Sequence, residues 1–321
     1  LSHKMIEKSL FQYNKRILRV SQLAAISVFD HIGKKNEEAA DKSAVESMRK
    51  ELNKIDFRGT VVIGEGERDK APMLYIGEKV GSGKGMKVDI ALDPLEGTKI
   101  TANNQKNALT VLAIGNNKSF LHAPDVYMEK IAVGPGLPDN FIDLDFPLEK
   151  ILKNLSKERK KKLSDIVVCV LDRPRHEKIF KILDKNNCKK FLIPDGDILG
   201  AISTALKKKK IDMYIGIGGA PEGVLAAAAL KCLGGQMQCR LVFSEKSQEI
   251  RAKKMGISDL NKKYSINDLV KKDVIFAASG VTDGSLLKGI KKKVNRFTTN
   301  SFIISTKTKK IDFIESDFKI P

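Results

Sequence analysis

The sequence lacks tryptophan, holds only 4 cysteines and 4 histidines, and contains no apolar run near the roughly 20 residues that a membrane helix requires. The cysteines (Cys169, Cys188, Cys232 and Cys239) lie far apart and form no Cys-x-x-Cys pair, which argues against a disulfide framework. Cys169 and Cys239 fall in apolar runs and are expected to be buried thiols, so we predict a cytoplasmic protein that does not span a membrane. The first residues are not typical of a signal peptide, and Met5 is a candidate natural start.

Negative charge is also scarce, because 39 acidic residues face 58 basic ones and leave a net charge of +19. Lysine supplies most of this excess, in runs at 159–162, 207–210 and 291–293. Nucleic-acid binding would favour interleaved aromatic side chains and arginines, but the runs lack aromatics and arginine is scarce. We therefore interpret the runs as solvated faces and predict no nucleic-acid partner. The positive field can still attract an anionic metabolite.

The periodicity of apolar residues predicts an α/β protein with two halves. In the first half, helices are expected at 5–32 and 39–53 and strands at 60–63, 86–92 and 107–114. A basic helix at 148–162 marks the boundary, so we divide the chain into tightly packed halves, 1–150 and 151–321. The second half alternates strands with helices, which predicts a mainly parallel sheet. Its expected strands are 166–171, 190–194, 212–217 and 236–243, with helices at 175–186, 198–207 and 221–232, and the tail adds strand-like runs at 274–277 and 297–305.

Two short acidic strings, Gly64–Asp69 and Asp89–Thr98, follow apolar strands in this otherwise basic chain. Open α/β sheets bind ligands where strands end, and crowded carboxylates repel one another unless a cation neutralises them. In the second string, Pro94 is expected to stop the strand, so that Asp93 and Glu96 converge across a turn. The alternative is a polar turn with a capping aspartate. Oxygen ligands at this density predict Mg²⁺ or Mn²⁺ acting on a phosphorylated substrate.

Three further strings place polar groups at strand ends. Pro194–Asp197 precedes a helix, where Asp195 and Gly196 could contact sugar hydroxyls and Asp197 is equally expected as an N-cap. Gly216–Val224 is a glycine loop that opens a helix and could bind an anion, although its spacing does not match a dinucleotide fingerprint. Asp172–His176 carries two arginines suited to a second phosphate. Tyr127 could hold a phosphate or a hydroxyl, but an isolated tyrosine is more often part of a core.

The combination of Gly-Glu-Gly-Glu, Asp-Pro-Leu-Glu-Gly-Thr, Pro-Asp-Gly-Asp and Gly-Gly-Ala-Pro-Glu-Gly resembles the class II fructose-1,6-bisphosphatases, the glpX type of the lithium-sensitive metal-dependent phosphatases. The resemblance runs from Ala40 to beyond Val242. It implies metal ligands at Asp41, Glu65, Asp93, Glu96 and Glu222. It implies catalytic roles for Glu67, Asp69 and Thr98, the last beside the attacking water. It implies substrate contacts at Glu96, Gly97, Thr98, Tyr127, Arg173, Arg175, Asp195, Gly196, Asp197 and Gly219. One position departs from the pattern, because Glu37 stands where family members often have lysine.

By this resemblance the fold is a layered α/β/α/β/α sandwich, and the reaction is hydrolysis of the 1-phosphate of fructose 1,6-bisphosphate to fructose 6-phosphate in gluconeogenesis or carbohydrate biosynthesis. The resemblance also implies a homo-oligomer, a dimer or a tetramer. A sedoheptulose-1,7-bisphosphatase, or one enzyme that serves both sugars, stays open, since the substrates differ by one hydroxylated carbon. An inositol- or nucleotide-phosphate phosphatase is disfavoured because Arg173 and Arg175 imply a second phosphate. A basic nucleic-acid-binding protein is the non-enzyme alternative.

Overall fold

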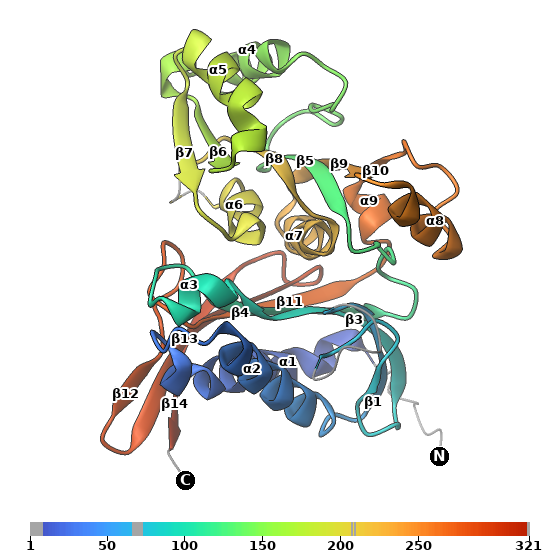
Figure 1. The fold of residues 1–321 in the computed structure, drawn as a ribbon, viewed down its shortest axis with the longest axis vertical. Helices are drawn as coiled ribbons and strands as arrows, with labels where there is room; N and C mark the ends of the chain where they lie inside the picture. Colours follow the sequence, from blue (N-terminus) through green and yellow to red (C-terminus); the bar gives the residue numbers. More distant parts are fainter. Residues whose placement is uncertain (1–8, 66–72, 207, 209, 320–321) are drawn as a thin grey trace, which may run out of the picture.

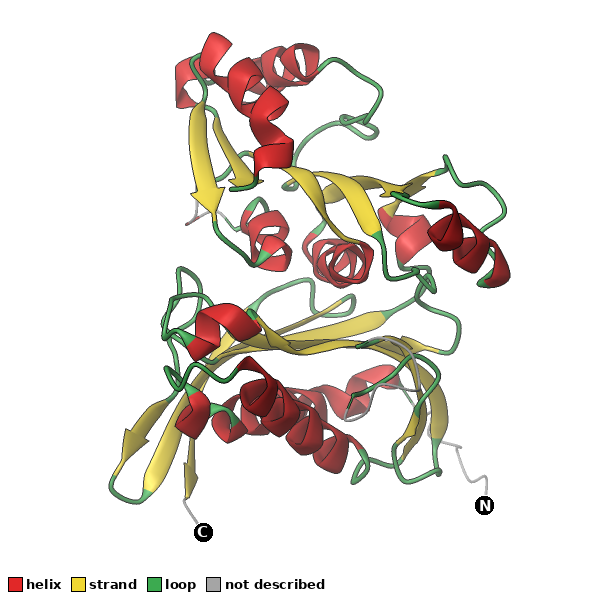
Figure 2. Ribbon diagram, in the orientation of Figure 1, coloured by secondary structure: helices red, strands yellow, loops and turns green. Residues whose placement is uncertain are grey.

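The computed structural model describes residues 9–65, 73–206, 208 and 210–319, which form a mixed α/β protein built on two sheets. The sheets lie one above the other, with helices between them and on both outer sides (Figures 1 and 2). From bottom to top in Figure 1, the order is α1 and α2, the first sheet, α6 and α7, the second sheet, and α4 and α5. Every helix among the described residues is too short or too polar to cross a bilayer.

The first sheet has eight strands and is largely antiparallel, with β1 and β3 as its parallel pair. Its order is β12 (Lys291–Lys293), β13 (Arg296–Ser305), β11 (Val274–Gly280), β4 (Leu109–Asn116), β3 (Met86–Glu96), β1 (Phe57–Ile63) and β2 (Lys79–Val80), with β14 (Asp312–Lys319) also paired to β13. The tail of the chain therefore returns to the sheet that the N-terminal strands begin.

The second sheet has six strands in the order β10 (Lys263–Ser265), β9 (Gln236–Val242), β5 (Tyr127–Val133), β8 (Met213–Gly219), β6 (Val167–Leu171) and β7 (Lys189–Ile193). The expected mainly parallel arrangement holds only for β6 with β7 and β8. It is wrong for the rest of the sheet, because β5 inserts between β8 and β9 and pairs antiparallel with both.

The described helices are α1 (Asn14–Ser27), α2 (Glu37–Leu52), α3 (Thr98–Ala102), α4 (Leu148–Arg159), α5 (Glu177–Lys185), α6 (Asp197–Ser203), α7 (Ala220–Leu233), α8 (Lys246–Lys254) and α9 (Ile266–Leu269). The long first helix expected from the periodicity is shorter than predicted. Its described part opens with a 3₁₀ turn at Leu10–Tyr13, and a second 3₁₀ turn, Phe29–His31, follows α1.

Apolar side chains fill the space between successive layers. One cluster joins α1 and α2 to the first sheet, for example through Ile17, Met48 and Ile90. The largest cluster joins the other face of that sheet to α6, α7 and the second sheet, and a third joins α4 and α5 to the outer face of the second sheet. The alanine-rich α7 is buried on most sides, which lets both sheets approach it closely.

Pro94 does not stop its strand, contrary to the expectation. β3 continues to Glu96, and its pairing with β4 shifts register between Asp93 and Glu96. The pairing of β3 with β1 has already ended at Ala91. The missing N–H of Pro94 therefore falls where the ladder is interrupted on one side and absent on the other, a position that tolerates proline.

Candidate active site

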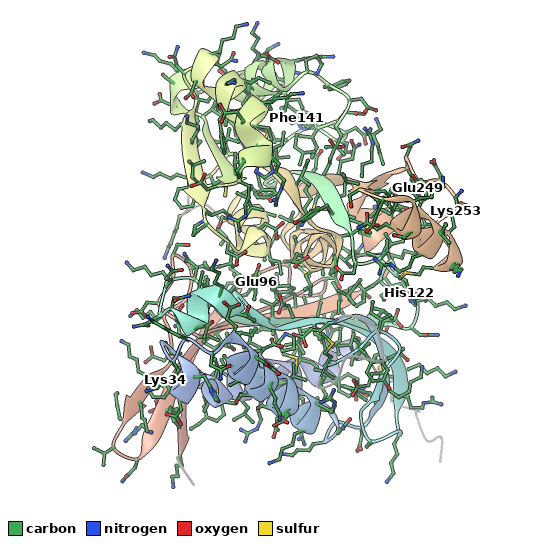
Figure 3. The ribbon with its side chains drawn as sticks, viewed as in Figure 1. Lys34, Glu96, His122, Phe141, Glu249 and Lys253 are labelled. Carbon is green, nitrogen blue, oxygen red and sulfur yellow. The ribbon has the colours of Figure 1, made fainter. Side chains whose placement is uncertain are left out.

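A cavity of 520 Å³ lies where the ends of β1, β3, β6 and β8 meet the starts of α3, α6 and α7. It collects most of the predicted site residues from both halves of the chain. The predicted residues that line it are Asp41, Glu65, Asp93, Glu96, Gly97, Thr98, Tyr127, Arg173, Arg175, Asp195, Asp197, Gly219 and Glu222. Glu96, labelled in Figure 3, lies between the first sheet and the layer of α6 and α7.

Three predicted residues are not among those lining the cavity. Glu67 and Asp69 lie outside the described residues. Gly196 is buried and is the N-cap of α6, with a φ of 85° that favours glycine.

The bulge in β3 places two carboxylates in the cavity. The Asp93 Oδ1 atom accepts a hydrogen bond of 3.1 Å from the Leu95 N–H, and Glu96 is only 5% exposed. Gly97 follows with a φ of 93° and lets the chain turn directly into α3, whose first residue is Thr98. Burial raises the pKa of Asp93 and of Glu96 well above their ordinary values, and neighbouring carboxylates raise both further.

A second pair of carboxylates approaches from α2 and from the end of β1. Burial, followed by the charges of Asp41 and Asp93, raises the pKa of Glu65 to about 9, while Arg49 opposes the shift. Burial also raises the pKa of Asp41, and hydrogen bonding to Glu65 opposes this shift. The loop needs glycine before Glu65, because a Cβ on Gly64 would lie 2.2 Å from the Leu74 carbonyl oxygen.

Glu222 enters from the first turn of α7 and completes the acidic group. A Cβ on Gly219 would lie 1.9 Å from the Glu222 Oε2 atom, so the glycine leaves room for this carboxylate. Burial and then the charge of Asp197 raise the pKa of Glu222, whereas Lys130 lowers it.

The donor chemistry of this group fits a hard divalent cation. Four buried carboxylate oxygens have no hydrogen-bond partner: Glu65 Oε2, both oxygens of Glu96, and Glu222 Oε2. Buried anionic oxygens without a proton donor are costly, and a cation that takes oxygen ligands would satisfy them. Among the described residues, no group of three acidic, histidine or cysteine side chains lies close enough together to hold a metal ion. The donors therefore surround one cavity without converging on a point, as expected for carboxylates that repel one another.

Two arginines also line the cavity. Arg175 donates from Nε and Nη2 to the Ile217 carbonyl oxygen, at 3.0 and 2.8 Å, and lies 4.9 Å over the ring of Tyr127. Arg173 Nη1 donates to the Asp172 carbonyl oxygen at 2.9 Å. Tyr127 is 51% exposed, so it belongs to the mouth of the cavity rather than to a core.

His176 is a buried residue to which sequence reasoning assigned no role. Its Nε2 atom accepts a hydrogen bond of 2.8 Å from the Ile217 N–H, so Nδ1 carries the proton and donates to the Leu171 carbonyl oxygen at 2.7 Å. These bonds tie the ends of β8 and β6 together beside Arg175. Burial is the main cause that lowers the pKa of His176 and favours the neutral ring that the bonds require.

The turn before α6 differs from one expectation. Gly196, not Asp197, is the N-cap, and Asp197 is the first residue of the helix. The Asp197 side chain instead binds Lys130, a buried lysine of β5 that no sequence pattern had indicated. Asp125, which precedes β5, also lines the cavity and was missed.

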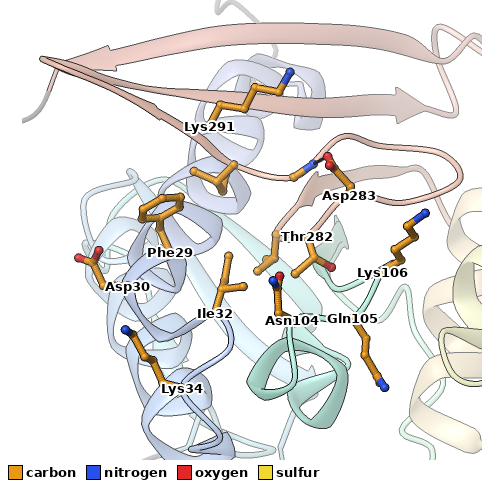
Figure 4. A pocket seen from close by; sticks show the side chains of 13 residues that line it. Phe29, Asp30, Ile32, Lys34, Asn104, Gln105, Lys106, Thr282, Asp283 and Lys291 are labelled. Atoms are coloured by element: carbon orange, nitrogen blue, oxygen red, sulfur yellow. Dashed lines mark hydrogen bonds between the residues drawn. The ribbon is translucent and has the colours of Figure 1, made fainter.

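A second hollow of 540 Å³ lies between the segment after α1 and the loops that precede β4 and β12 (Figure 4). Its charged residues are Lys34, Lys106, Lys291, Asp30 and Asp283. The labelled lysines point in different directions, and Asp283 accepts a hydrogen bond of 2.9 Å from the Gly289 N–H. It holds none of the unpartnered buried carboxylate oxygens found among the described residues, so the first cavity is the candidate active site.

Comparisons with known proteins point to one family. The family model described as bacterial fructose-1,6-bisphosphatase, glpX-encoded, matches residues 12–318. The chain is 44% identical over 312 residues to the class 2 fructose-1,6-bisphosphatase of Haemophilus influenzae, covering 93% of each chain. It is equally identical to fructose-1,6-bisphosphatase 1 class 2 of Escherichia coli K12, covering 93% of this chain and 92% of that one. The extragenic suppressor protein suhB from Bartonella henselae overlaps with a TM-score of 0.33 at 13% identity, over 61% of this chain and 74% of that one, which is too little for an inference.

Proposed function

Because the chain belongs to the glpX-encoded bacterial fructose-1,6-bisphosphatases, we propose that it hydrolyses the 1-phosphate of fructose 1,6-bisphosphate, giving fructose 6-phosphate and phosphate. The enzyme would serve gluconeogenesis and related carbohydrate synthesis. One observation carries the assignment of the site: a single cavity is lined both by the acidic group and by two arginines. That arrangement suits a substrate with one phosphate that reacts and another that is only held.

The acidic group would hold the metal ions on which this family depends. Asp41, Glu65, Asp93, Glu96 and Glu222 are the proposed ligands, supported by their place in the lining of one cavity and by the unpartnered buried oxygens of Glu65, Glu96 and Glu222. A divalent cation there would supply Lewis-acid polarisation of the 1-phosphate and a lower pKa for water at the site. We propose Mg²⁺ or Mn²⁺, since the proposed ligands are carboxylates and no cysteine or histidine lines the described cavity.

Thr98 is the proposed residue that orients the attacking water. Its position as the first residue of α3, directly after Glu96 and Gly97, puts a hydroxyl beside the acidic group. A hydroxyl can accept a hydrogen bond from water and donate one to a phosphate oxygen. Glu67 and Asp69 are proposed to act with it as catalytic acids. Positioning and charge neutralisation supply most of the rate in phosphoryl transfer, so no covalent phosphoenzyme is required.

Arg173 and Arg175 are proposed to bind the 6-phosphate. The Arg175 guanidinium is held by the Ile217 carbonyl oxygen and the Tyr127 ring, which reduces its freedom before substrate arrives. Asp195, Asp197 and Gly219 border the same cavity and would face the sugar. Binding energy from the non-reacting phosphate can then orient the reacting end.

The lysine runs do not favour the nucleic-acid alternative. The run at 159–162 begins at the last residue of α4, and the run at 291–293 forms the exposed β12. The two elements lie at opposite ends of the molecule in Figure 1. They cannot form one continuous binding face, so solvated lysines explain them.

Several broader features are proposed on the same basis. The order of helices and sheets supports the layered α/β/α/β/α sandwich of sugar phosphatases. Halves at 1–150 and 151–321 remain our proposed division, although β5 and the strands from β11 onward pair across it. A dimer or tetramer is proposed from the resemblance.

The four buried free thiols fit a reducing compartment, which supports the cytoplasm as location.

A substrate panel tests the proposal. Phosphate release would be measured for fructose 1,6-bisphosphate, sedoheptulose 1,7-bisphosphate, fructose 6-phosphate and an inositol monophosphate, each with Mg²⁺ and with Mn²⁺. We expect the highest kcat/KM for fructose 1,6-bisphosphate. A higher value for the seven-carbon substrate would move the assignment to that sugar, and activity confined to monophosphates would contradict a bisphosphatase.

A further inference from the structure

Lys130, on the central strand β5, is the only fully buried lysine among the described residues, with 1% of its surface exposed. Removing an ammonium group from water is strongly unfavourable unless it is paired, and even paired charges often contribute little net stability. A lysine at such a position therefore needs a reason other than stability. The surroundings of its Nζ atom supply one.

The Nζ atom lies 2.5 Å from the Oδ2 atom of Asp197, which lines the candidate active site. The Tyr214 hydroxyl donates a second hydrogen bond to the same oxygen, at 3.4 Å. The other oxygen, Oδ1, makes no hydrogen bond to any residue in the described part of the chain. One oxygen of Asp197 is thus anchored from inside the protein, while the other is left to accept a donor.

The chain keeps space open for this pair. A Cβ on Gly218 would lie 2.1 Å from Asp197 Oδ2 and 3.2 Å from Lys130 Nζ, so a larger residue there would displace the contact. Gly218 itself lines the cavity. Asp197 therefore lines the cavity and Lys130, which does not, contacts it there, so the geometry of the pair can affect a bound substrate.

We propose that Lys130 is a positioning residue, which fixes Asp197 so that its Oδ1 atom accepts a hydrogen bond from a hydroxyl of the sugar. This role rests on the proposed function, because it assigns Asp197 to the sugar part of the same site. Lys130 also balances the charge of Asp197, which would otherwise repel a substrate with two phosphates. The residue touches neither substrate nor reacting atoms and acts only through Asp197.

The test compares Lys130→Met, Lys130→Arg, Asp197→Asn and the double variant with the unmodified protein. Loss of a hydrogen bond to a charged group predicts that Lys130→Met raises KM for fructose 1,6-bisphosphate about 10- to 100-fold. kcat should change much less, because the acidic group and the arginines remain. Lys130→Arg keeps the charge and should recover part of the lost affinity. Binding of fructose 6-phosphate, measured by calorimetry, should weaken in parallel, whereas inhibition by inorganic phosphate should not change.

The double variant separates positioning from a merely structural role. If Lys130 acts through Asp197, the double variant should have the same KM as Asp197→Asn alone. A further rise in KM in the double variant would overturn the proposal. So would a 10- to 100-fold fall in kcat in Lys130→Met without a change in its KM. If Lys130→Met does not fold, the double variant can still be compared with Asp197→Asn, since it carries neither the unpaired carboxylate nor the buried ammonium group.

Lys161→Met is the matched control. Lys161 Nζ lies 2.6 Å from the buried Asp212, and neither residue lines the cavity. This variant should be less stable but keep its KM. A preparation without activity on fructose 1,6-bisphosphate would contradict the proposed function alone, and the binding of fructose 6-phosphate by the variants would still decide the role of Lys130.

Discussion

Glu65→Gln should make the protein more stable in excess chelator while it removes a proposed metal ligand. The pKa of Glu65 is raised from an ordinary value of 4.5 to about 9, mainly by burial and then by the charges of Asp41 and Asp93. A carboxyl group whose folded-state pKa is raised contributes stability below the unfolded value, and this stability is lost as the pH rises toward the folded value. Glutamine has the same shape and never ionises, so the variant escapes the loss.

The magnitude follows from the shift. Each pH unit above 4.5 costs the unmodified protein about 1.4 kcal/mol at this site, so the difference at pH 7 is about 3 kcal/mol. At about 2 °C per kcal/mol for a chain of this size, Tm should rise by up to about 6 °C.

The assay is thermal or denaturant unfolding of both proteins between pH 5.5 and 9 in excess chelator. The gap between the two stability curves should widen as the pH rises and should close toward pH 5. Glu46→Gln is the control, because Glu46 lies exposed on the same helix as Asp41 and pairs only loosely with Lys42, at 3.9 Å. Parallel curves for Glu65→Gln and the unmodified protein, or a variant less stable at every pH, would refute the reasoning.

Three further predictions concern two residues that line the cavity and the buried His176. Asp93→Asn keeps the shape but removes one ligand charge, so kcat at saturating metal should fall at least about 100-fold, or about 2.7 kcal/mol of barrier; near-normal turnover would remove Asp93 from the site. Arg175→Ala should raise KM for the bisphosphate by the equivalent of about 1.5–3 kcal/mol, lower kcat less than Asp93→Asn does, and leave hydrolysis of a monophosphate nearly unchanged; equal damage to both substrates would place Arg175 nearer the metals. The pKa of His176 is lowered from 6.5, chiefly by burial, so its contribution to stability should be complete above pH 6.5 and be lost as the pH falls through the folded-state value. Unfolding curves from pH 8 to pH 5 should show this loss in the unmodified protein and not in His176→Gln, and identical curves would contradict it.

Much of the site could be predicted because its residues follow strands in strings that are unusual for a basic chain. Glycines flank Glu65 and follow Glu96, where the structure requires a close approach at Gly64 and a positive φ at Gly97. Such requirements are local and are visible in a sequence. The side chains that these loops carry were therefore found without knowledge of the tertiary contacts.

The strand β5 was not predicted because its sequence lacks the usual alternation of apolar and polar residues. Both faces of this central strand are mostly buried, so the alternation typical of a half-exposed strand is absent, and Lys130 occupies a position where an apolar residue is expected. Its burial depends on Asp197, which lies 67 positions further along the chain. No local pattern reports such a partner, and the Lys130–Asp197 pair could not be predicted for the same reason.

Long-range pairing was equally hidden. β11 and β13 join the sheet of β3 and β4, and β5 joins β8 and β9, although each lies in the other half of the predicted division. Strand pairing depends on which edges are free after the helices have packed, not on the strand sequences alone. The expectation that Pro94 stops its strand was wrong for a similar reason. A strand tolerates proline at a bulge, and this bulge forms only when β3 pairs with β4.

The most direct test of the central claim is phosphate release from fructose 1,6-bisphosphate in excess chelator, followed by addition of Mg²⁺ or Mn²⁺, with the product identified by ³¹P NMR. The account predicts no release in chelator, release after the metal is added, and fructose 6-phosphate as the remaining sugar phosphate. Undiminished release in chelator would contradict the metal-dependent mechanism, and fructose 1-phosphate as product would show that the substrate binds with its two phosphates in the opposite order.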